Sequence, residues 1–268
     1  MSKIHYTVQG QGQPLVLIHG FPNDSSAWEP LLPALTSRYR VLLPDLPGAG
    51  QSPLPAAPLS LEYMASAIAA MLDREQIPAA VLAGHSMGGY TALEFAARYP
   101  GRLKGICLVH SLASADSAEK KENRRKAIAL IRKGEAEKEM FLRGMAQNLF
   151  AESFAASHPA AVRNVVDLGM KLSADALAAF YQAIMERSDK QALLETLDCP
   201  LQWIIGNEDT ATPMKDALAQ CYKARVNAVS LYEPCGHMSF IEHTGRLAAD
   251  LNAFLDYCYR EVSPADHL

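Results

Sequence analysis

Long hydrophobic runs are missing from this chain of 268 residues. No stretch of about 18 apolar residues occurs, so a membrane-spanning helix is not expected. The opening decapeptide, MSKIHYTVQG, has no apolar core of the kind that secretory signal peptides carry, and we expect no export signal. These two absences favour a cytoplasmic protein that does not associate with membranes.

A large excess of either charge is also missing. Lys and Arg total 25, Asp and Glu total 29, and the formal net charge at pH 7 is −4. Nucleic-acid-binding domains usually carry a basic excess, so we expect no nucleic-acid partner. The expected partner is a small-molecule substrate, bound by a monomer or a homodimer.

Cysteines are few and irregularly placed. There are five, and no two of them form a CxxC pair, so reduced thiols are the simplest interpretation. The chain has neither a His, Cys and Asp cluster at metal-ligand spacing nor a glycine-rich nucleotide fingerprint. We therefore expect no metal and no organic cofactor.

What the chain does have is a regular alternation of strand and helix patterns. Short apolar runs that end in Gly or Pro predict buried strands, and segments with helical periodicity lie between them. Such alternation produces right-handed crossovers and a mostly parallel, doubly wound α/β sheet. The predicted strands are residues 4–8 (at an edge), 14–20, 39–48, 79–86, 103–111, 199–209 and 228–237, and the predicted helices are 25–39, 60–77, 87–100 and 246–262. Ser25 or Ser26 is the predicted N-cap of the first helix, and Ser60 that of the second.

The alternation stops between residues 114 and 197. This segment contains no convincing strand, and its patterns are helical. Residues 1–113 and 198–268 are therefore predicted to form the core, with residues 114–197 as an inserted helical cap. The basic run from Lys120 to Lys126 is typical of a solvated helix face; the alternative is a cap surface that recruits acidic substrates.

Polar residues stand at the carboxyl ends of the predicted strands. Parallel strands end at the same edge of a sheet, and ligands bind beyond that edge. We therefore expect these side chains to converge there. They are His19, Asp45, Ser86, Ser111, Asp209 and His237.

Ser86 lies in the stretch Gly84-His85-Ser86-Met87-Gly88, between a predicted strand and a predicted helix. Glycine on both sides permits a tight turn that lifts the hydroxyl above the sheet, and the next helix directs N–H groups at developing negative charge. A phosphate-binding turn or a plain tight turn is the alternative. We interpret Ser86 as a nucleophile.

A serine nucleophile needs a base, and the base needs an acid that orients it. His237, after the last predicted strand, is the predicted base. Asp209 follows the preceding strand and is the predicted acid, with Glu208 and Asp116 as alternatives. The chain order serine, aspartate, histidine differs from the orders of chymotrypsin and subtilisin.

Together these motifs resemble those of the α/β-hydrolase fold family over nearly the whole chain. The matching stretches are His19-Gly20-Phe21-Pro22, Asp45-Leu46-Pro47-Gly48-Ala49-Gly50-Gln51-Ser52, Gly84-His85-Ser86-Met87-Gly88-Gly89, residues 206–213 and Gly236-His237. The resemblance implies an oxyanion hole made by the backbone N–H groups of Phe21 and Met87. The short N-terminal region suggests a sheet without the family's first strand.

The resemblance also implies a serine hydrolase that works through an acyl-serine intermediate. Relatives with an aspartate nucleophile, the haloalkane dehalogenases and epoxide hydrolases, are disfavoured because serine occupies the turn. Cleavage of a small carboxylic ester is the leading interpretation. The second interpretation keeps the same triad and comprises hydrolysis of a C–C bond, a thioester or a lactone, and cofactor-free perhydrolysis. The third interpretation is a small-ligand receptor with a vestigial triad.

The substrate pocket is the part that the sequence constrains least. Methionine and aromatic side chains in the cap predict a pocket for an apolar acyl group, but at helical spacing such residues are also typical of a helix core. The low aromatic content of 7% and the adaptable methionines favour an aliphatic group. The candidate substrate-binding residues are His110, Met145, Phe150, Phe180 and Met238.

Overall fold

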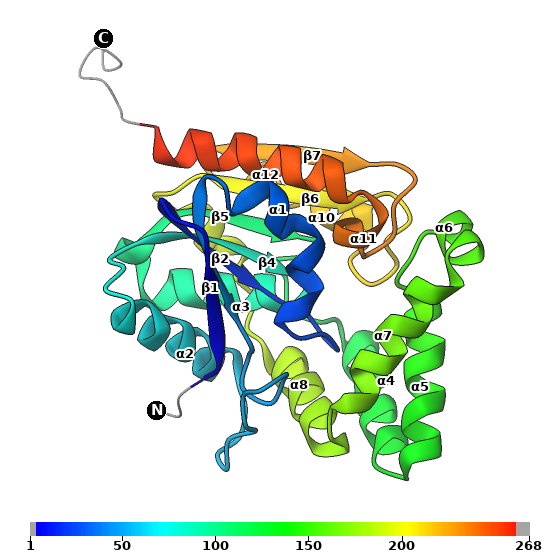
Figure 1. Cartoon of the computed structure of the whole chain (residues 1–268). Helices are drawn as coiled ribbons and strands as arrows, with labels where there is room; N and C mark the ends of the chain where they lie inside the picture. The colour runs from blue at the N-terminus through cyan, green and yellow to red at the C-terminus, as the bar shows by residue number, and fades with distance from the viewer. Residues whose placement is uncertain (1–3, 261–268) are drawn as a thin grey trace.

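Seven strands form one sheet in the structure, a computed structural model that describes residues 4–260. Their order is β1-β3-β2-β4-β5-β6-β7 (Figure 1). β1 runs antiparallel to β3, and the other neighbouring pairs are parallel. This confirms the predicted mostly parallel α/β sheet. The strands are β1 (Tyr6–Gln9), β2 (Gln13–Ile18), β3 (Tyr39–Pro44), β4 (Ala80–His85), β5 (Leu103–Val109), β6 (Leu201–Gly206) and β7 (Asn227–Tyr232).

The central strands are buried along most of their length. Residues 15–18 of β2 are fully inaccessible to solvent, and every residue of β4 and β6 is buried. Parallel strands covered on both faces show continuous apolar runs for this reason. β7, at the edge, instead exposes Val229 and Leu231.

Helices cover both faces of the sheet, as crossovers between parallel strands require. The 3-10 helix η1 (Ser25–Leu31), α1 (Leu32–Leu35) and α12 (Thr244–Tyr259) contact one another on one face. α2 (Leu61–Arg74) and α3 (Met87–Arg98) contact each other on the opposite face (Figure 1). The shorter elements of the core are η2 (Pro100–Arg102), α10 (Met214–Leu218) and α11 (Ser239–Glu242).

The first predicted helix, residues 25–39, differs from the expectation in two ways. Its N-cap is Asp24, whose carboxylate accepts from the Ser26 N–H at 2.9 Å, so the predicted cap at Ser25 or Ser26 is wrong. Its first half is a 3-10 helix that contains Pro30, and Pro33 follows at the start of α1. Proline has no N–H for a helical hydrogen bond, which explains the tighter, shorter turns.

The second predicted N-cap is confirmed. Ser60 Oγ accepts a hydrogen bond from the Tyr63 N–H at the start of α2. An extended serine before a periodic apolar segment satisfies one of the N–H groups that a helix terminus leaves without a partner.

Between β5 and β6 the chain forms helices alone. They contact one another and gather beside the carboxyl edge of the sheet, at the lower right of Figure 1. Ser117 caps the first of them and Ser173 the fifth. These helices are α4 (Ala118–Ile131), α5 (Glu135–Gln147), α6 (Glu152–Ser157), α7 (Pro159–Lys171), α8 (Ala174–Glu186) and α9 (Gln191–Leu194).

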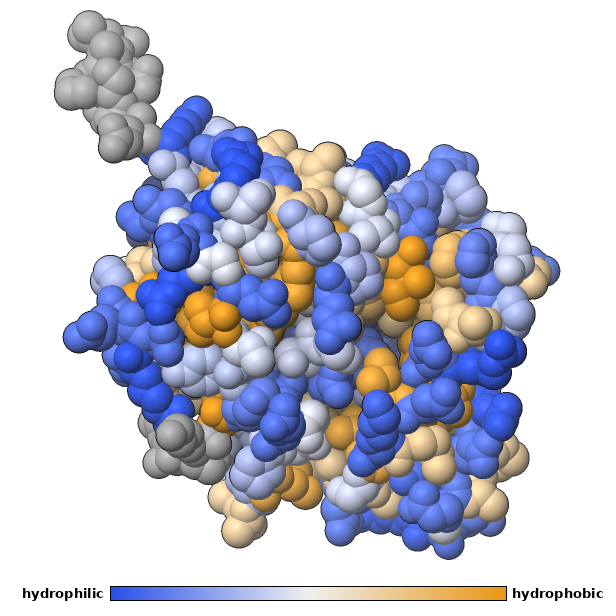
Figure 2. All heavy atoms as spheres, in the orientation of Figure 1, coloured by the Kyte–Doolittle hydropathy of each residue, from blue (hydrophilic) through white to orange (hydrophobic). Residues whose placement is uncertain are grey.

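The surface seen in Figure 2 is mostly hydrophilic, with hydrophobic residues in separate patches. Across residues 4–260, no helix combines the length and apolar character needed to cross a membrane. All five cysteines are free thiols, and Cys107, Cys221 and Cys235 are buried.

Candidate active site

Ser86 occupies a strained turn between β4 and α3. Its backbone φ is 50°, in the left-handed region that residues with a side chain rarely adopt. Its N–H donates to the Val109 carbonyl, and its carbonyl accepts from Ser111 Oγ, both at 2.9 Å. The end of β5 therefore holds both backbone groups of Ser86.

Gly84 and Gly88 make this turn possible because neither position has room for a side chain. A Cβ at Gly84 would lie 2.3 Å from the Gly88 carbonyl carbon, and a Cβ at Gly88 would lie 2.2 Å from the Ile18 carbonyl oxygen. The glycine pattern around Ser86 is thus explained by close backbone packing among β2, β4 and α3.

Replacing Gly88 with alanine is expected to lower the melting temperature. The added methyl group meets backbone atoms, and forced overpacking typically costs about 1–3 kcal/mol. Gly144→Ala is the matched control, since Gly144 lies inside α5 and a Cβ there meets nothing within 4 Å; it should stabilise the protein by up to about 1 kcal/mol. Thermal unfolding compares the two variants, and an unchanged melting temperature for Gly88→Ala would contradict this account of the turn.

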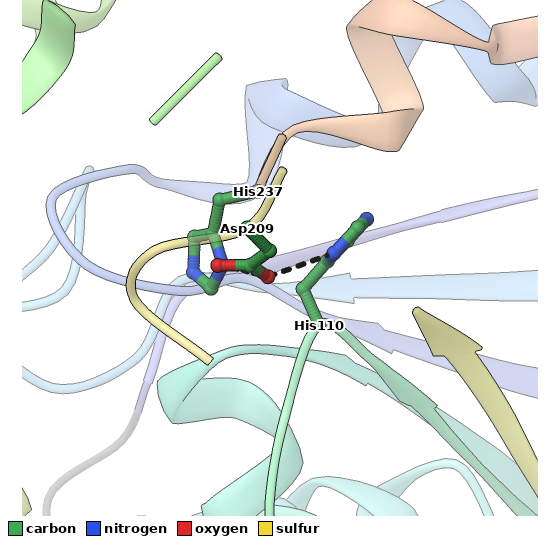
Figure 3. Close-up of side chains that lie close together, drawn as sticks. All are labelled: His110, Asp209 and His237. Carbon is green, nitrogen blue, oxygen red and sulfur yellow. Dashed lines mark hydrogen bonds and ion pairs between the residues drawn. The ribbon is translucent and has the colours of Figure 1, made fainter. Parts of the chain in front are cut away.

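The Asp209 carboxylate, in the turn after β6, contacts five hydrogen-bonding groups. Oδ1 accepts from the backbone N–H groups of Ala211 and Thr212 at 2.9 and 2.8 Å. Oδ2 accepts from Thr212 Oγ1 at 2.6 Å, and it also faces two histidines: Nδ1 of His237 lies at 2.8 Å and Nδ1 of His110 at 3.0 Å (Figure 3). These contacts hold the carboxylate in one orientation.

Two opposing effects decide the charge of Asp209. Burial would raise the pKa of its carboxyl group, because a buried anion loses its hydration. Attraction to His237 and the hydrogen bonds from His110 and His237 outweigh burial, and the pKa lies well below its usual range. Asp209 is therefore an anion at neutral pH.

His237 lies between β7 and α11 with its ring directed at Asp209. An ionised carboxylate can only accept hydrogen bonds, so in the neutral ring Nδ1 carries the proton. Nε2 then keeps its lone pair, which is the state that a general base requires. The His237 backbone N–H donates to the Leu149 carbonyl at 2.6 Å, which ties this turn to the segment between α5 and α6.

His85, although next to Ser86, is directed elsewhere, as expected for a packed turn residue. Its Nε2 lies 2.9 Å from the His237 carbonyl oxygen, and its ring centroid lies 4.7 Å from that of His237. Burial lowers the pKa of His85 well below the usual value. A neutral His85 therefore supports the backbone of His237.

The two N–H groups predicted to form an oxyanion hole follow adjacent strands. Phe21 comes shortly after β2, Met87 directly follows Ser86 at the end of β4, and β2 pairs with β4. Within residues 4–260 neither N–H donates a hydrogen bond. In the same loop, His19 Nε2 accepts from the Leu46 N–H at 2.9 Å, and burial lowers the pKa of the ring. His19 therefore shapes the loop as a neutral side chain.

The alternative acids are held away from the base. Asp116 forms ion pairs with two arginines at 2.6 and 2.8 Å, and Glu208 accepts from a backbone N–H at the start of α6 at 3.1 Å. Of the three acidic candidates, Asp209 is the one that contacts His237.

A family model described as the alpha/beta hydrolase fold matches residues 13–244, which is most of the chain. The chain belongs to the alpha/beta hydrolase fold family. The resemblance inferred from the motifs is thereby confirmed.

Several proteins similar to this α/β hydrolase are named pimeloyl-[acyl-carrier protein] methyl ester esterase. The one from Neisseria meningitidis serogroup C is 29% identical over 242 residues, which are 90% of this chain and 92% of that protein. The one from Xanthomonas campestris pv. campestris is 29% identical over 259 residues, 94% and 98% of the two chains. A solved structure of a thermophilic esterase from Thermogutta terrifontis has a TM-score of 0.91 at 29% identity, and the match covers 96% of this chain and 94% of the other.

Two of the predicted pocket residues of this α/β hydrolase lie in one aromatic group. The Tyr181 ring of α8 lies 4.4 Å from the Phe21 ring, and Phe180 contacts Phe21 edge-on at 6.4 Å. Tyr181 Oη also lies 3.9 Å from Met145 Sδ. Phe180 thus contacts the residue that carries one predicted oxyanion N–H, and Met145 contacts Tyr181 of the same group.

The other predicted pocket residues are placed differently. Phe150 is buried and stacks on Phe154 at 5.5 Å, and the buried Met238 directly follows His237. The side chain of His110 is 0% exposed, and its ring faces Asp209. At the end of β5 its backbone φ of 49° departs from strand geometry, and the ring lies against the acid.

Several contributors to the site were not anticipated from the sequence. Thr212 was one, although a hydroxyl residue shortly after an aspartate is typical of turns with side chain-to-backbone bonds. The segment between α5 and α6 was another: the Asn148 carbonyl accepts from Thr210 Oγ1 at 3.1 Å, and the Leu149 carbonyl accepts from His237. No local pattern predicts those contacts.

Proposed function

We propose that this α/β hydrolase is a serine ester hydrolase with Ser86 as nucleophile, His237 as general base and Asp209 as the orienting acid. The observation that carries the proposal is the 2.8 Å contact between Asp209 Oδ2 and His237 Nδ1, at the sheet edge where the Ser86 turn also lies. An ionised acid, a base with a free Nε2 and a serine on a strained turn are the parts that acyl transfer needs.

The acylation step uses these groups in turn. His237 Nε2 takes the proton of Ser86 Oγ while Oγ attacks the ester carbonyl carbon. The backbone N–H groups of Phe21 and Met87 donate to the oxygen that becomes negative in the tetrahedral intermediate. When the intermediate collapses, the C–O bond to the alcohol breaks, and the proton on Nε2 passes to the leaving alcohol.

Deacylation repeats the sequence with water. His237 Nε2 takes a proton from a water molecule whose oxygen attacks the acyl-serine carbonyl, and the same two N–H groups hold the oxyanion. Collapse returns the proton to Ser86 Oγ and releases the carboxylic acid. Asp209 stays ionised throughout and stabilises the charged ring of His237.

A small carboxylic ester with an apolar acyl group is the substrate class that we favour. The similar proteins from Neisseria and Xanthomonas are named as methyl ester esterases, and the similar Thermogutta structure is an esterase. The aromatic side chains of Phe180 and Tyr181 beside Phe21 agree with an apolar acyl site.

Residues 114–197 act as the cap in this proposal. Their loop between α5 and α6 rests on the triad turns: besides the bonds of Asn148 and Leu149, the Ala151 N–H donates to Glu242 Oε2 at 2.9 Å. A cap anchored beside His237 would present its side chains to the acyl group.

A fluorophosphonate probe tests this function, because it forms a covalent bond with an activated serine. We expect the probe to label Ser86 in the folded protein, and peptide mass spectrometry locates the site. Ser111→Ala is an informative control, since Ser111 is the neighbouring hydroxyl and its variant should still be labelled at Ser86. A folded but unlabelled parent protein would exclude the serine hydrolase function.

A turnover panel then identifies the bond that is cleaved. It includes short- and long-chain esters, thioesters, lactones, a vinylogous 1,5-diketone, and peracid formation from acid and peroxide. We expect the highest kcat/KM for a carboxylic ester. Faster turnover of another class would replace the ester in the proposal, and ligand binding without any turnover would indicate a receptor.

A further inference from the structure

Two histidine rings face the same oxygen of Asp209, although the proposed chemistry uses one of them. His237 Nδ1 and His110 Nδ1 lie 2.8 and 3.0 Å from Oδ2. Figure 3 shows the carboxylate between the two rings. The side chains of His110 and Asp209 are 0% and 1% exposed, so water does not replace either partner.

The partner of His110 determines its protonation. An ionised carboxylate accepts but does not donate, so Nδ1 of His110 carries a proton, and burial lowers the pKa of the ring. Nε2 has no hydrogen-bond partner in the described part of the chain, and a second proton there would be buried without an acceptor. His110 is therefore a neutral donor to Asp209.

The charged and titratable groups around His110 come from four elements. His85 is the last residue of β4, and its ring centroid lies 6.2 Å from that of His110; the ring centroid of His237 lies at 5.5 Å. Asp209 accepts the hydrogen bond, and Glu242 of α11 adds a more distant negative charge. Of these four groups, Asp209 is the one that forms a hydrogen bond with the His110 ring.

The backbone of His110 belongs to the strand end that holds the nucleophile. Its N–H donates to the Ile204 carbonyl at 2.9 Å. Its two neighbours bind Ser86: the Val109 carbonyl accepts from the Ser86 N–H, and Ser111 Oγ donates to the Ser86 carbonyl. One short segment thus fixes the proposed nucleophile through its neighbours and the proposed acid through the ring of His110.

We propose that His110 is a positioning residue that holds Asp209 and shares its negative charge with His237, a role that rests on the proposed function. Its first effect is geometric, because a carboxylate held from both sides keeps Oδ2 aligned with the base. Its second effect is electrostatic. Each additional donor disperses the charge of Oδ2, so the carboxylate stabilises a protonated His237 less strongly.

Two variants of His110 separate this role from a structural one. His110→Leu removes the donor with a similar side-chain size. His110→Asn retains an N–H donor near the place of Nδ1 and tolerates left-handed backbone. We expect His110→Leu to lower kcat about tenfold with little change in KM, since a hydrogen bond to a charged group is lost. We also expect the acid limb of its kcat/KM profile to move upward by about 0.5–1 pH unit, and His110→Asn to restore the parental midpoint.

Proton NMR gives a second readout that needs no turnover. A ring N–H that donates to a buried carboxylate resonates far downfield, so the parent should show two such signals, one from each histidine. His110→Leu should lose one signal and shift the other, and Ser86→Ala should keep both. Because these signals do not require a nucleophile, they remain informative if Ser86 fails to react with the fluorophosphonate probe.

Three outcomes would overturn the proposal. A rise in KM at constant kcat would make His110 a substrate contact. A loss of thermal stability with an unmoved acid limb, measured on protein that is still folded, would leave it a purely structural residue. A parent spectrum with a single downfield signal would show that the His110 ring does not donate to Asp209.

Discussion

Replacing Ser86 with alanine is expected to lower ester turnover by roughly 10³- to 10⁶-fold, the loss typical when a triad member is removed. Alanine has no oxygen with which to form the acyl intermediate, so any remaining rate reflects the oxyanion N–H groups and substrate binding. The fold should persist, since the hydrogen bonds of Ser86 to Val109 and Ser111 involve its backbone. Alanine carries a Cβ as serine does, so it neither relieves nor adds backbone strain at φ 50°.

Initial rates with the best ester of the panel measure this effect, and thermal unfolding confirms that the variant is folded. His237→Ala is the companion change, and it should lose activity on a similar scale because the base and nucleophile act as a unit. Residual activity within about tenfold of the parent for either variant would refute the assignment of the triad.

The second large effect is expected for Asp209→Asn, with a loss of roughly 10⁴-fold in kcat. Thr212 Oγ1 and the rings of His237 and His110 all face Oδ2. An amide nitrogen at that place would face donors, and an amide oxygen there lacks the charge that stabilises the imidazolium. When the amide nitrogen faces His237, Nδ1 has to accept a hydrogen bond. His237 then adopts its other tautomer, in which Nε2 carries the proton and cannot act as the base.

Asp116→Asn is the control for this change. Asp116 is also buried and also forms ion pairs, but its partners are Arg124 and Arg187. Breaking a buried pair can cost several kcal/mol of stability, so rates are compared at a temperature where both variants are folded. Asp116→Asn should then retain activity within about tenfold of the parent. If Asp116→Asn lost more activity than Asp209→Asn, the acid would have to be reassigned.

Much of the fold follows from local sequence pattern. Residues 15–18 and β4 are uninterrupted apolar runs, and the sheet buries them on both faces. Ser60 precedes a periodic helix and caps it. The first helix was less accurately predicted because three adjacent residues, Asp24, Ser25 and Ser26, are all suitable caps, and two prolines interrupt the helical hydrogen bonds that follow.

The elements of the candidate triad were likewise accessible from the sequence. Ser86, Asp209 and His237 each follow a strand, and parallel strands bring such residues to one edge. The flanking glycines pointed to a tight turn, and the structure shows backbone atoms where their side chains would be.

Only the tertiary structure decided how these residues are held. The ring of His110 meets Asp209 across 99 residues of sequence, and its direction depends on a left-handed backbone at the end of β5. The contact of Leu149 with His237 depends on how the inserted helices rest on the sheet. The sequence by itself determined the strands, most helices of the core and the order of the catalytic candidates, because periodicity and turn chemistry are local. The contacts of His110 with the acid and of the α5–α6 loop with the base depend on packing between segments that are distant in the sequence. No local sequence pattern predicts such packing.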